Sequence, residues 1–210
     1  MKPGRQRHGA TPLARSALPV DTAALARTLI GKLLVRELPE GLASGRIVET
    51  EAYVIGDAAG HAYGGMTPRN RSLFFERGHA YVYLAYGVSF MLNVSSEASG
   101  IGAGVLIRAL EPAEGMAIMR QNRGVERLRD LTRGPGRLAQ ALRIDHSLDG
   151  LDLCRKGPLW LAHDDPGASE IGKGKIGKSV RIGITREADR VLRFYLRGSP
   201  FVSGAKSLNE

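Results

Sequence analysis

The stretch AYVYLAYGVSFMLNVSS, residues 80–96, contains three of the six tyrosines of the chain. Successive side chains of a β-strand point to opposite faces, so Tyr81 and Tyr83 are expected on one face. Tyr86 breaks this alternation and stands beside Gly87, where a hairpin could turn. Because tyrosine has a high β-propensity, one interpretation is a purely structural aromatic strand. The other is a stacking surface with an aromatic residue projecting from the turn.

The composition favours one globular domain in a reducing compartment. The 210 residues are 43% hydrophobic, which is ample for a single core. Cys154 is the only cysteine, so no internal disulfide forms, and an intracellular location is expected, in the cytoplasm or, in a bacterium, at the nucleoid. Residues 1–20 lack the apolar run of a secretory signal and are predicted to form a flexible basic tail. No stretch approaches the roughly 20 apolar residues that cross a bilayer, so a soluble protein without membrane contact is expected.

The charge balance favours a polyanionic partner. Lys and Arg number 30 against 21 Asp and Glu, which gives a net charge of +9. Such a field favours nucleic acid first and an acidic membrane second, although composition alone also fits a basic protein without such a partner. The excess is concentrated in two glycine-bearing runs, RQNRGVERLRDLTRGPGR (120–137) and GKGKIGKSVR (172–181). Backbone amides in such segments can also reach phosphates, so the distribution favours nucleic acid.

The order of the predicted elements indicates an α+β class, because helices and strands are interspersed without a regular βαβ alternation or repeat. We expect a single domain over residues 21–203, with a mostly antiparallel curved sheet, surrounding helices and a flexible end over 204–210. Predicted helices begin at Asp21, at Thr67 and Pro68, at Pro112, and in RGPGRLAQALRI (133–144), and the first two end at Gly31 and Gly78. Predicted strands cover residues 32–38, 44–54, 81–85, 88–94, 104–112, 158–162, 180–184 and 193–198.

Two glycine-rich motifs lack the neighbouring secondary structure that a nucleotide-binding loop requires. GKGKIGKS, residues 172–179, matches the written P-loop pattern, which needs a preceding strand and a following helix. The β-like VRIGIT follows instead, so nucleotide hydrolysis is rejected. Lys173, Lys175, Lys178 and Arg181 are then expected in a flexible basic loop that contacts a nucleic-acid backbone. GIGAG, residues 100–104, leads into a predicted strand and is rejected as well.

Two carboxylates are the strongest candidates for chemistry. Glu49 and Glu51 fall on one predicted strand face, with about 7 Å between their Cα atoms. An exposed pair that keeps the face hydrated is the simpler interpretation. However, Tyr53 continues the same face, with Ile47 before it, and His61 follows in a glycine-rich loop, so acid–base machinery is the alternative. The five histidines and one cysteine show no metal-ligand spacing, and no motif around Cys154 suggests a nucleophile.

Seven blocks of the sequence together resemble the alkyladenine, or 3-methyladenine, DNA glycosylase family. They occur in the family's order and extend the resemblance over residues 25–203. The blocks are GRIVETEAY, MTPRNRSLFF, AYVYLAYG, MLNVSS, VLIRALEP, RGPGRLAQAL and YLRGSP. The resemblance implies a monomeric, monofunctional base-excision repair enzyme with one α+β domain and no metal or organic cofactor. It also implies double-stranded DNA with damaged purines as substrate, including 3-methyladenine, 7-methylguanine and, in some members, hypoxanthine or ethenoadenine.

The resemblance also assigns roles to individual residues. Glu51 matches the general base that activates a water, and Arg108 matches the arginine that helps to hold this water. Tyr86 matches the tyrosine that intercalates where the damaged nucleotide has left the duplex. Pocket residues that would contact the extruded base are Tyr53, His61, Tyr83 and Asn93. Further candidate contacts to the DNA backbone are Arg69 and Arg137. No lysine or N-terminal proline takes the place of a nucleophile, so neither a Schiff base nor strand cleavage is expected.

Two other classes remain as alternatives. A non-catalytic nucleic-acid-binding domain would use the same tyrosines and basic loops only to stack bases. A substrate-docking module of a transferase is the other, since the family's fold is similar to the C-terminal domain of formyltransferases. The carboxylate of Glu51 and the pocket residues argue against the docking module, whereas release of a damaged base is the test that separates an enzyme from the binding domain.

Overall fold

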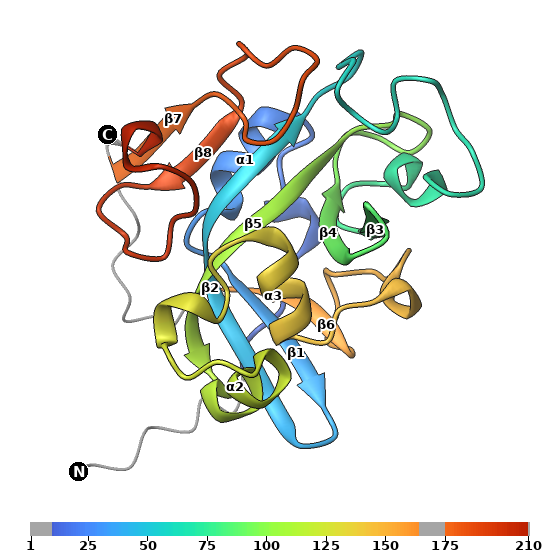
Figure 1. Cartoon of the computed structure of the whole chain (residues 1–210). Coiled ribbons are helices and arrows are strands. Elements are labelled where there is room, and N and C mark those ends of the chain that lie inside the picture. The colour runs from blue at the N-terminus through green and yellow to red at the C-terminus, as the bar shows by residue number, and fades with distance from the viewer. Residues whose placement is uncertain (1–9, 164–174, 210) are drawn as a thin grey trace.

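An antiparallel β-sheet forms the centre of the structure (Figure 1). The computed structural model describes residues 10–163 and 175–209. Within these residues the sheet has eight strands: β1 (Leu33–Leu38), β2 (Gly41–Tyr53), β3 (Ala80–Ala85), β4 (Ser89–Ser95), β5 (Gly104–Glu114), β6 (Leu159–Ala162), β7 (Ile176–Ser179) and β8 (Arg193–Leu196). The α-helices are α1 (Thr22–Leu29), α2 (Met116–Arg123) and α3 (Pro135–Ala141). All strand pairings among the described residues are antiparallel, so the predicted α+β class is confirmed.

Strand β2 is the central strand because it pairs with three others. Strand β5 pairs along one edge of β2 over almost its whole length. On the other edge, β1 pairs with residues 41–46 and β8 pairs with residues 49–51. The segment that contains Glu49 and Glu51 is therefore flanked by β5 on one side and by β8, from the far end of the chain, on the other.

Two irregularities in the β2–β5 pairing surround Glu49. The register shifts between Ile47 and Glu49 and again after Glu49, which leaves Val48 on β2 and Arg108 on β5 without an opposite residue. Bulges of this kind bend a strand and change the direction of its side chains. Arg108 is thereby directed towards the two glutamates of β2.

The bulge at Val48 also corrects the predicted strand alternation. Ile47 was expected on the face of Glu49, Glu51 and Tyr53, but it lies in the main core. Val48 instead joins a smaller cluster with Ala109, Tyr195, Phe201 and Val202. The polar residues Glu49, Glu51 and Tyr53 share a face as predicted, because the strand is regular beyond the bulge.

Helix α1 follows the predicted capping pattern. Asp21 is the N-cap, and its side chain accepts a hydrogen bond from the backbone N–H of Ala24 at 2.6 Å. Leu25 and Leu29 are fully buried against the sheet. The chain leaves the helix through Gly31, whose φ of +89° is accessible to glycine at little cost.

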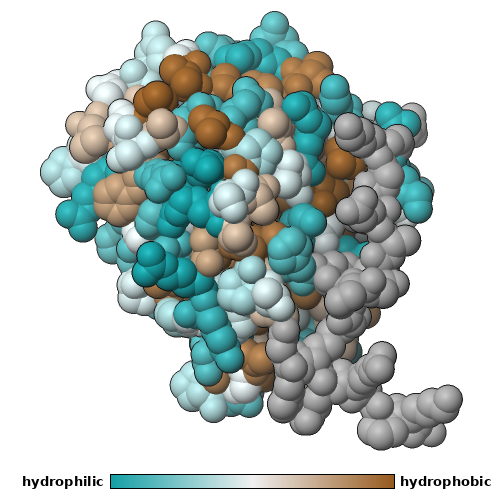
Figure 2. Space-filling model, turned by 180° about the vertical axis from the view of Figure 1, so that it is seen from behind, coloured by the Kyte–Doolittle hydropathy of each residue, from teal (hydrophilic) through white to brown (hydrophobic). Residues whose placement is uncertain are grey.

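On the face opposite to the view of Figure 1, hydrophobic residues occur in small areas among hydrophilic ones (Figure 2).

Strands β3 and β4 form the predicted hairpin. Their register pairs Ala85 with Ser89, which leaves three residues for the turn. Tyr86 has a φ of +51° and Gly87 a φ of +69°, and this left-handed backbone closes the turn tightly. The ring of Tyr86 is 92% exposed at the tip. The hairpin therefore presents an aromatic residue to solvent, as the sequence predicts.

Three predicted elements were wrong. Residues 67–78 contain only a 3-10 turn, Arg71–Phe74, because the Asn70 side chain accepts hydrogen bonds from Thr67 and fixes a loop instead of an α-helix. Strand β5 continues through Pro112 to Glu114, and α2 begins only after Gly115. Residues 180–184 are not a strand, since the pairing with β8 is made by residues 176–179. In the described part of the GKGKIGKS motif a strand thus stands where a P-loop needs a helix.

The packed unit extends beyond the predicted boundaries at both ends. Leu13 and Leu18 are buried in the core, and Pro12 forms a bridge to Ala162. At the other end, Leu208 and Asn209 accept hydrogen bonds from Arg193. Residues 1–9 and 210, which belong to the predicted tail and end, lie outside the described residues.

The two glycines that flank α2 allow a test of this packing. A Cβ atom at Gly115 would lie 2.4 Å from the carbonyl oxygen of Leu42 and 2.7 Å from the Cα of Ala43, whereas a Cβ at Gly124 would meet nothing within 4 Å. Both glycines have positive φ. We expect Gly124→Ala to lower the free energy of unfolding by about 1 kcal/mol. Gly115→Ala should cost about 2 to 4 kcal/mol, because the clash adds to the same strain. Urea unfolding of both variants checks this, and equal losses would contradict the close approach of β2.

Candidate active site

A cavity of about 630 Å³ opens between the sheet and the loop that follows β2. Its size falls within the range of about 300–1,000 Å³ that is usual for small-molecule sites. The residues that line it include Tyr53, His61, Tyr83, Tyr86, Asn93 and Arg108. The structure thus brings together all four predicted base-contacting residues with the predicted water-holding arginine and the hairpin tip.

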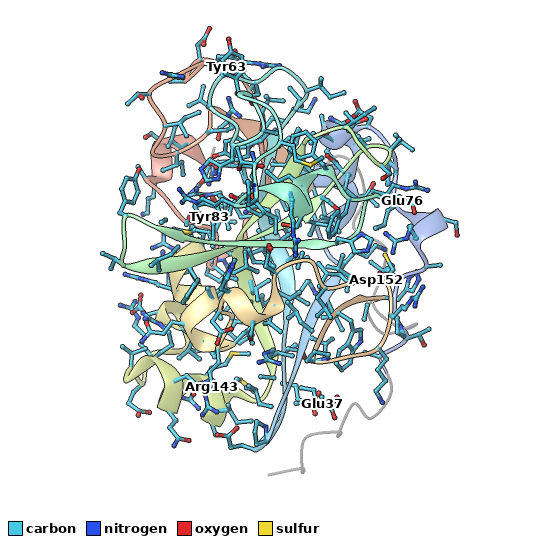
Figure 3. All side chains as sticks on the ribbon, turned by 90° about the vertical axis from the view of Figure 1, so that its right-hand side faces the viewer. Glu37, Tyr63, Glu76, Tyr83, Arg143 and Asp152 are labelled. Atoms are coloured by element: carbon cyan, nitrogen blue, oxygen red, sulfur yellow. The ribbon has the colours of Figure 1, made fainter. Side chains whose placement is uncertain are left out.

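Aromatic rings form one wall of this cavity. Tyr81 and Tyr83 stack with 5.4 Å between ring centroids, and His61 meets Tyr83 edge-on at 4.4 Å. Tyr83 lies on the side of the hairpin that faces the loop carrying Tyr63 (Figure 3). His61 Nδ1 and the Tyr81 hydroxyl share a hydrogen bond of 2.8 Å. Partial burial and the charge of Arg69 lower the pKa of His61, so its ring is neutral at neutral pH.

Tyr81 is a site residue that the predicted set omitted. Its ring is 1% exposed, and it supports both Tyr83 and His61 from behind. The shared strand face of Tyr81 and Tyr83 was the signal that pointed to it. Burial raises the pKa of Tyr81, so its hydroxyl stays protonated and available as a hydrogen-bond donor.

Glu51 lies behind the cavity lining, in contact with three residues that face the cavity. One carboxylate oxygen, Oε1, accepts a hydrogen bond from the backbone N–H of Ile182 at 2.7 Å and lies 3.2 Å from a terminal nitrogen of Arg108. The other, Oε2, accepts one from the Tyr53 hydroxyl at 3.1 Å. Tyr53, Arg108 and Ile182 all line the cavity, whereas the Glu51 carboxylate is fully buried directly behind them. An exposed pair of glutamates, the simpler interpretation of the sequence, is excluded because Glu49 is fully buried too.

The pKa of Glu51 lies above its ordinary value. Burial raises the pKa, while the charge of Arg108 and the hydrogen bonds from Ile182 and Tyr53 only partly offset this effect. The charge of Glu49 raises the pKa further. Burial and the charge of Glu51 raise the pKa of Tyr53 as well, so Tyr53 remains a neutral donor to the carboxylate. A carboxylate with raised pKa is a stronger base than an ordinary glutamate and suits proton abstraction.

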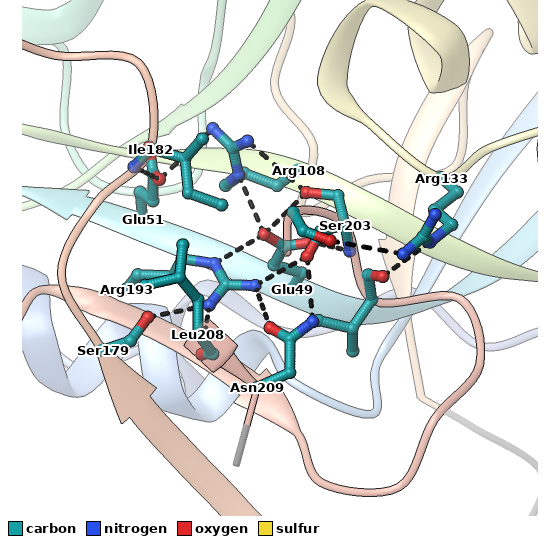
Figure 4. A network of polar contacts seen from close by, with 12 residues as sticks. Glu49, Glu51, Arg108, Arg133, Ser179, Ile182, Arg193, Ser203, Leu208 and Asn209 are labelled. Atoms are coloured by element: carbon teal, nitrogen blue, oxygen red, sulfur yellow. Dashed lines mark hydrogen bonds and ion pairs between the residues drawn. The ribbon is translucent and has the colours of Figure 1, made fainter. Parts of the chain in front are cut away.

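Glu49 has different surroundings. Its carboxylate forms ion pairs with Arg108 at 2.9 Å and with Arg193 at 2.7 Å (Figure 4). Ser203 donates to it from both the backbone N–H and the hydroxyl. Burial raises the pKa of Glu49, but the two arginine charges and these hydrogen bonds outweigh it and hold the pKa below its ordinary value. Glu49 is therefore firmly ionised, whereas Glu51 is the more basic of the two.

The prediction that Arg181 belongs to a flexible basic loop was wrong. Its side chain is buried and forms a two-pronged ion pair with Asp57, and its guanidinium lies 4.7 Å from the centre of the Tyr53 ring. It also donates to the backbone carbonyl of Ala52 at 3.1 Å. Arg181 therefore supports the cavity wall from behind and is buried instead of exposed in a basic loop.

The other predicted backbone contacts within the described residues lie in three places. Arg69 lines a small pocket beside His61, and Arg137 follows Pro135, which lines the main cavity. Lys178 is exposed on β7 and Lys175 is exposed just before this strand, which contributes no residue to the cavity lining. Lys173 lies outside the described residues.

No group of three or more His, Cys, Asp and Glu side chains is arranged to hold a metal ion in the described part of the chain. Cys154 lies outside the cavity lining, and burial raises the pKa of its thiol, which disfavours the reactive thiolate. None of the helices within residues 10–163 and 175–209 is long and apolar enough to cross a membrane.

Comparisons with known proteins give independent information on the family of the chain. The sequence model of the methylpurine-DNA glycosylase family matches residues 16–200. A Mesorhizobium japonicum protein named as a 3-methyladenine DNA glycosylase is 76% identical over 199 residues, which cover 95% of this chain and 93% of the relative. The human DNA-3-methyladenine glycosylase is 44% identical over 85% of this chain and 63% of its own length, and the mouse protein of the same name is 46% identical over 85% and 57%. The chain therefore belongs to the methylpurine-DNA glycosylase family.

Proposed function

We propose that this protein is a monofunctional DNA glycosylase that removes 3-methyladenine and related alkylated purines from double-stranded DNA. The observation that supports this most directly is the position of Glu51 directly behind the lining of an aromatic cavity that the exposed Tyr86 borders. The family of the chain and the names of its relatives support the same reaction class.

The first step is extrusion of the damaged nucleotide. A purine inside a duplex hides its glycosidic bond, so the enzyme has to rotate the nucleotide out of the stack. Tyr86 is 92% exposed at the hairpin tip, and Val88 beside it is 82% exposed. The Tyr86 ring would fill the vacated space in the duplex, and its stacking would offset part of the cost of unstacking.

Recognition follows from the aromatic wall and from charge. An alkylated ring nitrogen makes the purine cationic, and aromatic faces attract cations by about 0.5 to 2 kcal/mol, depending on desolvation. Tyr53 and Tyr83 would enclose the extruded base, with His61 at the rim. Asn93 is buried at the cavity and donates only a long hydrogen bond of 3.4 Å to the backbone of Tyr81, so its amide is available to exclude the exocyclic amino group of normal guanine.

Hydrolysis requires a water, a base and an environment that tolerates a cationic sugar. A water held between Arg108 and Glu51 would attack the sugar carbon C1′ and transfer a proton to the Glu51 carboxylate. The bond between C1′ and the purine nitrogen breaks, and its electron pair leaves with the base. The negative charge of Glu51 would also stabilise the oxocarbenium character of the sugar.

The general test is base release itself. Methylated DNA is incubated with the protein, and abasic sites are then cleaved with alkali. Release of free 3-methyladenine together with alkali-labile sites is expected. Tight binding without any release would favour the non-catalytic nucleic-acid-binding alternative.

Replacing Glu51 should separate binding from chemistry. Glu51→Gln removes the proton acceptor but keeps the shape of the side chain. We expect base release in single-turnover assays to fall by about 10²–10⁴-fold, while the Kd for lesion-containing DNA changes little. An equal loss of affinity, measured by fluorescence anisotropy, would contradict the assignment of Glu51 as the base.

The pH dependence should report the raised pKa of Glu51. The base acts only when it is ionised, so the rate falls as the pH drops through the pKa of Glu51. Because this pKa is raised, the midpoint should lie above the ordinary glutamate value of about 4.3. Excision of 7-methylguanine is the suitable measurement, since this cationic base leaves without needing a proton. A midpoint at or below the ordinary value would argue against a desolvated base.

Tyr86 variants test the proposed wedge. Tyr86→Ser removes the ring and should slow excision from a fully paired duplex about 10-fold or more, because about 1–3 kcal/mol of stacking is lost. Excision from the same lesion opposite a gap should change much less. Tyr86→Phe is the matched control and should remain close to wild type. An unchanged rate for Tyr86→Ser on paired DNA would refute the role.

A further inference from the structure

Arg108 contacts both glutamates of β2, but it contacts Glu49 more closely than Glu51. Arg108 directs its Nε to Glu49 at 2.9 Å and only one terminal nitrogen to Glu51 at 3.2 Å. Its other terminal nitrogen lies 3.4 Å from the Ser203 hydroxyl. The guanidinium is planar and its donors have fixed directions, so its contact with Glu49 determines how it meets Glu51.

Arg193 occupies the opposite side of Glu49. It is fully buried and donates from Nε to the Glu49 carboxylate at 2.7 Å. Its two terminal nitrogens bind the C-terminal segment 203–209 and β7. The acceptors are the Ser203 carbonyl at 3.0 Å, the Leu208 carbonyl at 3.0 Å, the Asn209 side chain at 2.7 Å and the Ser179 hydroxyl at 2.7 Å. Figure 4 shows that these contacts meet at the Arg193 guanidinium, which in turn contacts Glu49.

The charges explain why a second arginine is needed. With Arg108 alone, two buried carboxylates would share one positive charge, and Glu51 would have to compete with Glu49 for it. With Arg193 present, Glu49 has an arginine of its own and four donors in total. Arg108 can then stay anchored to Glu49 without rotating into a two-pronged pair with Glu51.

We propose that Glu49, together with Arg193 and Ser203, is a positioning group that anchors Arg108 so that Glu51 remains free to act as a base. This inference rests on the proposed function of Glu51 and extends it to the C-terminal segment. A two-pronged pair between Arg108 and Glu51 would occupy the carboxylate oxygens that have to receive the proton from water. The anchored geometry leaves Oε2 with a single neutral donor, the Tyr53 hydroxyl.

The electrostatic surroundings of Glu51 agree with this proposal. The groups that face its carboxylate are Arg108 from β5, Tyr53 and Glu49 from β2, and the backbone N–H of Ile182. Tyr83 of β3 also lies within electrostatic reach. Of these groups, Glu49 is the one other carboxylate, and its negative charge raises the pKa of Glu51. Loss of that charge should therefore lower the pKa of Glu51.

The experiment compares Glu49→Gln with wild type in single-turnover excision of 7-methylguanine across the pH range. We expect the acid limb of the profile to move to lower pH and the plateau rate to fall about 10- to 100-fold, less than for loss of the base itself. The Kd for lesion-containing DNA should stay within about 2-fold of wild type. An acid limb at the wild-type pH would overturn the proposal, because a merely structural residue changes the amount of folded enzyme but not the midpoint.

Ser203→Ala provides a second variant in case Glu49→Gln does not fold. It deletes only the hydroxyl that binds Glu49 and Arg108. We expect a plateau rate about 3- to 10-fold below wild type with an unchanged Kd. Ser207→Ala is the matched control, since Ser207 is exposed in the same segment and should retain the wild-type rate. Equal rates for the two serine variants would overturn the proposal. A wild-type protein that releases no base would overturn the proposed function as well, so the two failures are distinguishable.

Discussion

The structure depends on the compensation of two buried negative charges. Glu49 and Glu51 are both fully buried, and an unpaired ionised carboxylate in a protein interior costs several kcal/mol. Arg108 and Arg193 supply two positive charges, and backbone and side-chain donors satisfy the remaining carboxylate positions. Full compensation at Glu49 and partial compensation at Glu51 produce two carboxylates of different basicity within three residues of one strand. In the proposed reaction that difference separates a structural glutamate from a chemical one.

The fold satisfies this requirement through the position of β2. Strand β5 supplies Arg108 on one edge, and β8 supplies Arg193 on the other. A regular β5 would alternate its side chains strictly, and the register shift opposite Glu49 is what directs Arg108 to the polar face. The C-terminal segment closes the network by placing Ser203 on Glu49. Residues from three distant parts of the sequence thus meet at one carboxylate.

Sequence patterns predicted those parts of the site that are formed by residues close together in the chain. The hairpin with Tyr86 at its tip follows from strand alternation and a glycine at the turn, and the pairing of Glu51 with Tyr53 follows from their spacing of two. The capping of α1 by Asp21 is equally local. The role of Arg193 was not predictable, because it lies 144 residues from Glu49 and resembles any other arginine of a basic chain. The burial of Arg181 was missed for the same reason, since its partner Asp57 is 124 residues away. Bulges also have no simple signature in the sequence, so Ile47 was assigned to the wrong face of β2.

Tyr53 links the cavity wall to the chemistry. Its ring lies against the Arg181 guanidinium on one side, and its hydroxyl binds Glu51. A cation behind an aromatic ring weakens the attraction of that ring for a second cation in front, but the ion pair between Arg181 and Asp57 neutralises much of this effect. The arrangement therefore fixes the ring rigidly without making the cavity repel a charged purine. Because the hydroxyl of the same residue contacts the proposed base, a purine that displaces the Tyr53 ring would also disturb the Glu51 carboxylate. In the proposed reaction, substrate fit and proton transfer would in this way be coupled through one side chain.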